Sequence, residues 1–384
     1  MHTIKSTPIL LILLLLLPNG FADEAKSSDI DPQIKKKVKK SVDHGLLFLR
    51  STQTPEGHWG HPGITALAAI AFMKSPRKYS DEDGPFIRRP IEFLLSIQKE
   101  DGGVYKKTLP NYNTSVALLA FLEAKKVFKN PELLARIDKA IPRAKKFLRG
   151  IQVDEQEGYT SKDKFYGGVG YGGDQRPDMS NIQLSIEAMR KAGVPEDDPF
   201  FQKALQFLQR CQNRSESNDQ KWARGGSEDG GFVYYPGNSP AGKEKKPDGT
   251  TAFTSYGSMT YAGIKSFIYA GVDRKDPRVE AAVNWIQKHY SITENPNMGT
   301  QGLYYYYHTF AKALRVYDID TITDSNGKTH NWRNELCDHL LSLQNTDENS
   351  DGFGSWKNDN PRWWEGDPTL ATIYAVLTLN HCYE

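Results

Sequence analysis

The sequence predicts an all-α fold of six consecutive helical hairpins, and two observations lead to this prediction. First, one motif occurs six times: a Leu or Ile, four positions later a Gln in every copy but the fifth, and after a gap a Gly near an aromatic residue. The first copy is Leu49, Gln53 and Gly57-His58-Trp59. Second, an apolar segment with very few charges follows every copy. A hairpin of this kind cannot bury its apolar face alone, so the units must pack on one another.

Each unit begins with an amphipathic helix. In the first unit, Val38, Val42 and Leu49 recur at helical spacing among five lysines, which puts the lysines on the solvent face. The later helices lead to Gln98, Gln152, Gln212, Tyr290 and Gln344, where the fifth unit has Tyr in place of Gln. We expect these six helices to form an outer layer.

Each unit ends with a second helix that is small and apolar. These helices are rich in Ala, Leu, Ser and Thr, so they must be surrounded on most sides. They are expected at residues 64–73, 114–124, 181–192, 258–270, 308–317 and 369–379. The units therefore predict an α/α toroid of six inner and six outer helices, in which the first hairpin touches the last. Strands are expected only in short hairpins.

The repeated glutamine has a structural explanation. A side-chain amide near the end of an outer helix can hydrogen-bond the backbone at the start of the following turn. A feature that recurs in every unit normally belongs to the scaffold. We therefore predict that these glutamines join neighbouring repeats and take no part in a reaction.

The N-terminus has the pattern of a signal peptide. A short apolar run from Ile9 to Leu17 is followed by Pro18 and by small residues on both sides of Phe21. The run is too short to span a bilayer, and no later stretch is longer. We expect residues 1–22 to be the signal peptide and residues 23–384 to form the toroid, exported to the periplasm or secreted.

Charge and cysteine content exclude some classes of partner. The net charge is only +2, so no large single-sign field points to nucleic acid or to an anionic membrane. Cys211, Cys337 and Cys382 share no metal-ligand spacing. One pair of them could form a disulfide in an oxidising compartment, but the sequence does not say which pair. It leaves the oligomeric state open as well.

The repeat resembles that of a known superfamily. The stretch FLRSTQTPEGHW is similar to the repeat shared by squalene and hopene cyclases and the β-subunits of protein prenyltransferases, and the similarity of pattern covers essentially the whole mature chain. Stretches such as YGGDQRPDMSNIQ and SYGSMTYAGI also resemble exported bacterial members of this superfamily. The resemblance implies a toroid with a central cavity for an apolar, isoprenoid-like substrate.

The catalytic motifs of the superfamily's known members are missing. The Asp-x-Asp-Asp motif with which class II cyclases protonate an alkene does not occur. If Asp248 corresponds to the zinc-binding aspartate of the prenyltransferases, Thr250 stands where their cysteine is required. The Gly-Cys-Gly-Glu-Gln stretch of complement-like thioester toroids is also absent. We therefore expect no bound metal and no cofactor.

Polar and aromatic residues gather where the inner helices begin, at the predicted opening of the ring. Acids and asparagines at such positions commonly cap helices, as Asp178 and Asp367 could. His308 lies in an otherwise apolar helix, where it could be a core residue or an acid/base group. We expect Asp178 and His308 to be the catalytic candidates, as proton donor or acceptor. The candidate substrate-binding residues are Asn181, Tyr256, Tyr307, Trp363 and Asp367.

Two classes of function agree with these residues. An enzyme that acts on an isoprenoid-like substrate would use aromatic walls to stabilise cationic intermediates. A binding module for an apolar molecule or a glycan would need only the aromatic surface. Polysaccharide cleavage by a lyase is a further alternative, although no specific cluster for it stands out. If the protein is an enzyme, cyclase-like, isomerase-like or transferase-like chemistry is expected.

Overall fold

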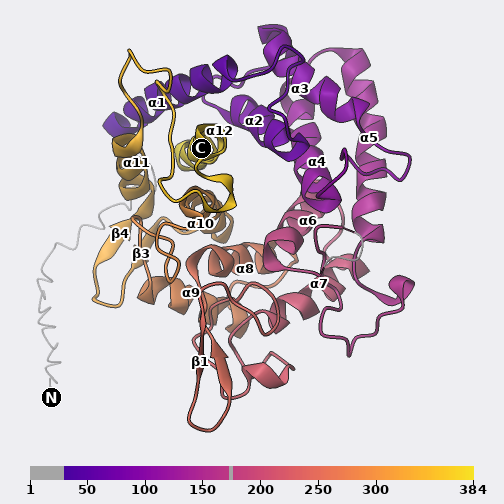
Figure 1. Ribbon diagram of the computed structural model, residues 1–384, viewed down its shortest axis with the longest axis vertical. Helices are drawn as coiled ribbons and strands as arrows, with labels where there is room; N and C mark the ends of the chain where they lie inside the picture. The colour runs from indigo at the N-terminus through magenta and orange to yellow at the C-terminus, as the bar shows by residue number, and fades with distance from the viewer. Residues whose placement is uncertain (1–29, 173–175) are drawn as a thin grey trace, which may run out of the picture.

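The computed structural model describes residues 30–172 and 176–384, in which twelve α-helices alternate between two layers (Figure 1). The predicted signal peptide lies outside the described residues. The inner helices are α2 (Pro62–Lys74), α4 (Pro110–Val127), α6 (Met179–Lys191), α8 (Gly257–Tyr269), α10 (Leu303–Tyr317) and α12 (Pro368–Tyr383). The outer helices are α1 (Pro32–Ser51), α3 (Pro85–Ser96), α5 (Pro131–Gly150), α7 (Pro199–Arg210), α9 (Pro277–Lys288) and α11 (Trp332–Leu343). No described helix is both long enough and apolar enough to cross a membrane.

The inner helices form a closed ring. Each packs on the next, and α12 packs on α2 (Figure 1). Outer helix α1 packs on α11 and α12 as well, so the first and last hairpins touch. Across this junction Ser41 Oγ donates to Gln344 Oε1 at 2.7 Å, and Asn380 Nδ2 donates to the carbonyl of Ala71 at 3.0 Å. The predicted all-α toroid is confirmed.

Proline and acid residues start many of these helices. Eight helices have Pro in their first turn, where the missing N–H has no helical partner to lose. Asp31, Asp198, Asp276 and Asp367 cap four of them by accepting hydrogen bonds from first-turn amides. These local signals separate the hairpins along the chain.

The repeated glutamines join neighbouring repeats, as predicted. Gln152 Nε2 donates to the carbonyl of Gly167 at 2.9 Å and to that of Phe200, on the next outer helix, at 3.0 Å. Gln53, Gln98, Gln212 and Gln344 make the same pair of bonds in their own units. In the fifth unit Tyr290 Oη instead donates to Glu335 Oε2, on the next outer helix, at 2.9 Å.

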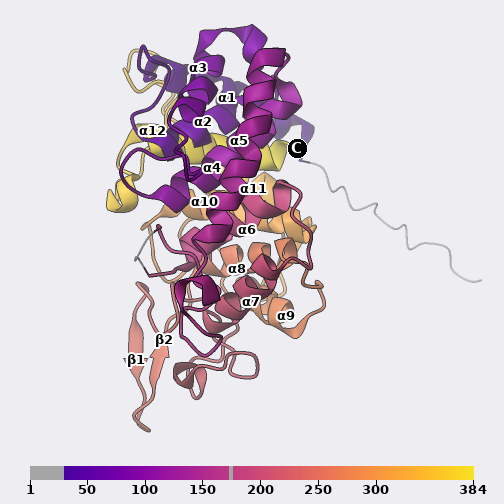
Figure 2. The same cartoon turned by 90° about the vertical axis from the view of Figure 1, so that its right-hand side faces the viewer.

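The described strands form only two short antiparallel hairpins. Strand β1 (Lys243–Lys245) pairs with β2 (Thr251–Phe253), and β3 (Thr321–Thr323) pairs with β4 (Thr329–Asn331). The β1–β2 hairpin projects from the edge of the ring on the same side as the loop that precedes α12, coloured yellow (Figure 2). The loops at this side surround the opening where the inner helices begin.

Candidate functional site

A cavity of about 780 Å³ opens at the N-terminal ends of the inner helices. Its wall is mainly aromatic and aliphatic, with contributions from every inner helix or the loop before it. The aromatic lining residues are Tyr112, Tyr171, Tyr234, Tyr256, Tyr305, Tyr374, Trp363 and Trp364. Ile64, Leu109, Leu184, Met259 and Leu370 supply apolar surface between the rings. This volume is within the usual range for small-molecule sites.

Two tryptophans from the loop before α12 stand at the rim of this cavity. Trp363 is 49% exposed and Trp364 is 61% exposed, which is unusual for side chains of this size. Their backbones have φ of 55° and 67°, in the left-handed region that non-glycine residues rarely occupy. The Arg362 guanidinium lies 4.4 Å from the ring centre of Trp363. The loop therefore holds two aromatic side chains at the opening in a strained conformation.

The charged residues on the cavity wall are two arginines and one buried glutamate. Arg176 and Arg362 contribute positive charge. Glu365 is almost fully buried and accepts hydrogen bonds from the amides of Tyr304 (3.1 Å) and Tyr305 (2.8 Å), at the start of α10. Burial raises the pKa of the Glu365 carboxyl, against these opposing hydrogen bonds. Glu365 thus caps α10, while Arg362 donates to the Gln301 side chain and the Arg176 guanidinium lies 4.2 Å from the ring centre of Tyr235.

Asp178 and Asn181 lie directly behind the cavity wall. Asp178 caps α6: its carboxylate accepts from the Asn181 amide N at 3.0 Å, from Asn181 Nδ2 at 2.9 Å and from Ser180 Oγ at 2.7 Å. Burial raises the pKa of Asp178, although these hydrogen bonds oppose the rise. Ser180 and Tyr234 do line the cavity, and their hydroxyl oxygens are 3.4 Å apart. A hydroxyl therefore connects the buried carboxyl to the cavity surface.

Of the other candidate residues predicted at the opening of the ring, Tyr256 lines the cavity wall, whereas Tyr307 and His308 do not. The prediction is wrong for these two because of helical geometry. Tyr305 faces the cavity, and Tyr307, two residues further along α10, points about 200° away around the helix. Tyr307 Oη instead lies 2.9 Å from Nε2 of His339 on outer helix α11.

His308 lies one layer below the cavity. Its ring stacks at 5.8 Å from that of Tyr374, which lines the cavity, and lies 5.3 Å from the ring of His381. Burial, reinforced by Lys312, holds the pKa of His308 well below its usual value. A neutral, enclosed imidazole in this position packs against the cavity floor and does not reach the cavity.

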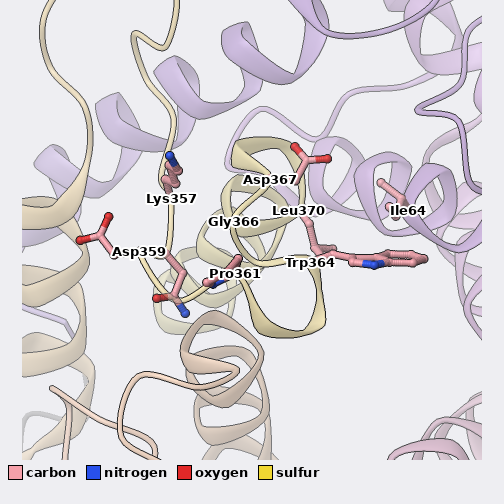
Figure 3. A pocket seen from close by; sticks show the side chains of 9 residues that line it. Ile64, Lys357, Asp359, Pro361, Trp364, Gly366, Asp367 and Leu370 are labelled. Atoms are coloured by element: carbon pink, nitrogen blue, oxygen red, sulfur yellow. The ribbon is translucent and has the colours of Figure 1, made fainter.

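Asp367 faces a neighbouring hollow of about 500 Å³ that shares Ile64, Trp364 and Leu370 with the main cavity. Figure 3 shows Asp367 near the start of α12 and the Trp364 indole extending toward Ile64. The Asp367 carboxylate accepts from the Thr369 amide at 2.8 Å and so caps its helix. Of the predicted binding residues, the structure therefore brings only Tyr256 and Trp363 to the main cavity.

The described residues show no ready-made metal centre. Among residues 30–172 and 176–384, no three His, Cys, Asp or Glu side chains lie together as a ligand set. Asp248 lies in the turn of the β1–β2 hairpin, where it accepts from Thr250 Oγ1 at 2.6 Å. That the purified protein carries no stoichiometric zinc stays a prediction, and elemental analysis checks it.

Fold and site together define an α/α toroid with an aromatic cavity at one mouth. No protein-family model matches the sequence. The structure is similar to the type II terpene cyclase MstE from Scytonema without ligand, with a TM-score of 0.52 at 14% identity over 91% of this chain and 98% of that one. It is also similar to an alpha-amylase from Clostridium perfringens, with a TM-score of 0.52 at 9% identity over 89% and 97%. The fold expected from the repeat is thus confirmed, and it is shared by proteins with different activities.

Proposed function

We propose that the protein binds an apolar, isoprenoid-like molecule in its aromatic cavity. The observation that carries this proposal is the 780 Å³ space walled by six tyrosines and two tryptophans. Burying an apolar chain against such a wall contributes about 25 cal/mol for each Å² removed from water. The terpene-cyclase-like fold supports the same ligand class. Arg176 and Arg362 would hold an acidic head group, so the ligand we favour has an apolar body and one anionic end.

The proposal extends to conversion of this ligand by a proton transfer from Asp178. The raised pKa of the buried carboxyl favours its protonated form. For the transfer, the protonated Asp178 carboxyl would donate to Ser180 Oγ, 2.7 Å away, while the serine hydroxyl turns from Asp178 to the cavity and gives its own proton to the ligand; Tyr234 would orient this hydroxyl. The aromatic wall would then stabilise the carbocation formed by protonation of an alkene, and loss of a proton from a neighbouring carbon back through Ser180 to the Asp178 carboxylate would give an isomerised or cyclised alkene and restore the acid. His308 is not part of this scheme, since it does not reach the cavity.

Native mass spectrometry after incubation with isoprenoid alcohols and acids tests binding. Leu184→Trp fills part of the cavity and should abolish ligand retention. Leu47→Trp adds the same side chain on the exposed face of α1, where Leu47 is 57% exposed, and should retain the ligand. Equal retention by both variants, at unchanged melting temperature, contradicts binding in this cavity.

Product analysis on the same mixtures tests conversion. Asp178→Asn keeps a side chain that can cap α6, so the fold should remain stable while turnover falls by about 100-fold or more. Ser180→Ala should lower turnover without loss of binding. If Asp178→Asn converts the ligand as fast as the unchanged protein, Asp178 is a helix cap only.

A glycan ligand is the second candidate, and the exposed Trp363 and Trp364 favour it. Flat indoles at an opening can stack on sugar rings, each contact contributing about 1 kcal/mol. Titration with oligosaccharides, followed by tryptophan fluorescence, should then show saturable binding that Trp363→Ala and Trp364→Ala each weaken. Retention of the ligand by these variants, together with its loss in Leu184→Trp, would decide for the apolar ligand.

Export is also part of the proposal. Its support is the signal-peptide pattern of residues 1–22. N-terminal sequencing of the protein from the periplasm or the medium should begin near Asp23. Recovery of the full-length chain from the cytoplasm alone would contradict this.

A further inference from the structure

A third cavity, of about 510 Å³, lies at the opposite mouth of the ring. There the inner helices end, and the C-terminus lies on this side, away from the yellow loop (Figure 2). Most of its lining is charged, and all six inner helices contribute. The lining residues are Met73, Lys74, Lys78, Glu123, Lys126, Val127, Lys191, Tyr269, Lys312, Arg315, Val316, His381 and Glu384. It shares no residue with the aromatic cavity.

Positive charge is in clear excess at this mouth. Five lysines and one arginine line it, against the two glutamates Glu123 and Glu384. One further pair of opposite charges, Lys265 and Glu187, lies just behind the lining and is almost completely buried. Counted in their charged forms, these side chains carry an excess of four positive charges, which falls to three where Lys312, whose pKa burial lowers to about 7, is neutral; the net charge of the whole chain is only +2. A concave site with such an excess attracts anions.

A buried ion cluster closes the floor of this basic cavity. Glu187 has no exposed surface, and its carboxylate lies 2.7 Å from Lys312 Nζ, 3.0 Å from Lys191 Nζ and 2.9 Å from Lys265 Nζ. Lys265 also donates to Gln183, whose amide nitrogen is 3.4 Å from the Tyr305 hydroxyl at the aromatic cavity. Three cations around one carboxylate leave the cluster positive.

The neutralisation of helix ends does not explain all of these cations. Lysines in the last turn of a helix interact favourably with its negative end, which explains Lys74, Lys126 and Lys191. Lys265 and Lys312, however, project from positions before the last turn, and Lys78 lies beyond the end of α2. Lys265 and Lys312 both lie against Glu187, whose single carboxylate cannot neutralise both, and Lys78 has no carboxylate partner in the described residues.

Two features show that the site is suited to an anion. The Glu384 carboxylate already sits between Lys74 Nζ, at 2.9 Å, and the Arg315 guanidinium. His381 lines the cavity, is only 5% exposed, and its Nδ1 has no hydrogen-bond partner in the described residues. A buried polar atom without a partner is uncommon and calls for one.

We propose that this basic mouth binds a small anion with two to four negative charges carried on phosphate groups, such as a diphosphate. Ammonium groups act as point charges that suit a tetrahedral oxyanion, whereas a planar carboxylate is better matched by paired arginines. Three to four unmatched positive charges correspond to a diphosphate better than to a single carboxylate. Met73, Val127 and Tyr269 give apolar surface for an organic substituent. The site is separate from the aromatic cavity and does not depend on the function proposed for it.

Isothermal titration calorimetry with inorganic diphosphate, at pH 7.5 and low salt, tests this inference. One anion should bind per chain. The double variant Lys78→Glu/Lys126→Glu changes two exposed lining residues and should weaken binding by about tenfold or more. The matched control, Lys36→Glu/Lys40→Glu on the solvent face of α1, makes the same change in net charge and should alter binding by less than about twofold. Equal effects of the two double variants would overturn the proposal.

Two further experiments test the roles of Glu384 and Lys312 inside the site. Glu384→Gln removes the carboxylate that occupies Lys74 and Arg315, so it should tighten diphosphate binding several-fold. Burial lowers the pKa of Lys312 to about 7, so binding should be accompanied by proton uptake, visible as heats that differ between buffers. Lys312 contacts Glu187, and its charge interacts with those of Lys191 and Lys265 and with the His308 and His381 rings; the other titratable groups that line the same cavity are Lys74, Lys78, Glu123, Lys126, Tyr269, Arg315 and Glu384. Weaker binding in Glu384→Gln, or no proton uptake, would overturn the assignment.

Titration with ADP tests whether the site recognises an organic phosphate ester or the phosphate groups alone. Tighter binding of ADP than of inorganic diphosphate indicates an organic ester, and equal binding indicates recognition of the phosphates alone. Absence of binding by both at millimolar concentration would overturn the proposal. Leu184→Trp, which blocks the aromatic cavity, should leave diphosphate binding unchanged, so failure here and failure of the proposed function can be told apart.

Discussion

Single side chains hold the repeats together, and Gln152 shows how. It is 2% exposed, and its amide bonds two carbonyls that belong to different elements. Gln152→Leu keeps a similar volume but removes both donors. Because a buried polar group that loses its partner costs about 1–3 kcal/mol, the free energy of unfolding should fall by about 2 kcal/mol or more. Urea denaturation measures this change.

The control for this prediction is the same substitution at Gln53. That side chain makes the equivalent bonds but is only half-buried, so water can replace its amide. Gln53→Leu should therefore destabilise the protein less than Gln152→Leu does. Equal losses would mean that the hydrogen bonds contribute little and that packing dominates.

Two buried histidines give the stability a pH dependence. Burial holds the pKa of His308 and of His381 well below the usual 6.5, with Lys312 acting in the same direction on both. In the unfolded chain both rings take up protons below about pH 6.5, while in the fold they stay neutral. Stability is therefore lost as pH falls below 6.5, by about 1.4 kcal/mol per pH unit for each ring until its folded pKa is reached.

The double variant His308→Gln/His381→Gln tests the predicted loss of stability below pH 6.5. Chemical denaturation at pH 7.5 and at pH 5.5 should show a smaller loss of stability for the variant than for the unchanged protein. If both proteins lose stability in parallel, these rings are not the cause, and carboxylates that are protonated over this range must be examined.

At the scale of elements, glycines set how closely each turn approaches the next outer helix. Gly167 has a φ of +80°, and a Cβ built on it would lie 1.9 Å from the carbonyl oxygen of Lys203 on α7. Gly102 makes the corresponding approach to the carbonyl of Arg143 on α5. The repeated glutamine and this glycine act together, because Gln98 Nε2 donates to the carbonyl of Gly102 and Gln152 Nε2 donates to that of Gly167.

Gly167→Ala should therefore be severely destabilising, by about 3 kcal/mol or more, because steric overlap adds to the cost of the left-handed backbone. Gly158→Ala is the matched control: its φ is +82°, but nothing lies within 4 Å of the added methyl group. That variant should lose only about 1 kcal/mol. Thermal denaturation of the two variants distinguishes the cost of steric overlap from the cost of the left-handed backbone. Similar losses of stability in both would contradict the close-contact explanation.

The sequence allowed these elements to be predicted better than the side chains that face the cavity. Repetition identifies the hairpins because every unit carries the same Gly and all but the fifth carry the same Gln. The orientation of a side chain depends on where a helix begins, and a shift of two residues separates Tyr305 from Tyr307. Tyr234 reaches the cavity from a loop without periodicity, so no pattern could identify it. Asp178 could be recognised as a helix cap, but its link through Ser180 needs three-dimensional contacts.

At the scale of the whole molecule, ring closure leaves no terminal repeat. Gln344 joins the last unit to the first through the carbonyl of Ser41, at 3.0 Å. An open array of repeats can fray from its ends, whereas each unit of a closed ring has two neighbours. Scanning calorimetry should therefore show one transition, which Gln344→Leu moves to lower temperature without splitting. A separate early transition in that variant would show that closure contributes little to cooperativity.

The buried cluster around Glu187 has a kinetic consequence for whatever occupies the aromatic cavity. Among the described residues the aromatic and basic cavities share no lining residue, and the Glu187 cluster lies between Lys312 of the basic cavity and Tyr305 of the aromatic one, so we expect the aromatic cavity to have one opening. A bound molecule would then have to leave by the opening through which it entered, and a second molecule could bind only after the first had dissociated. Residence time is then governed by this opening, where Trp363 and Trp364 stand. A ligand would therefore enter and leave the aromatic cavity through the same opening, and would not pass through the ring.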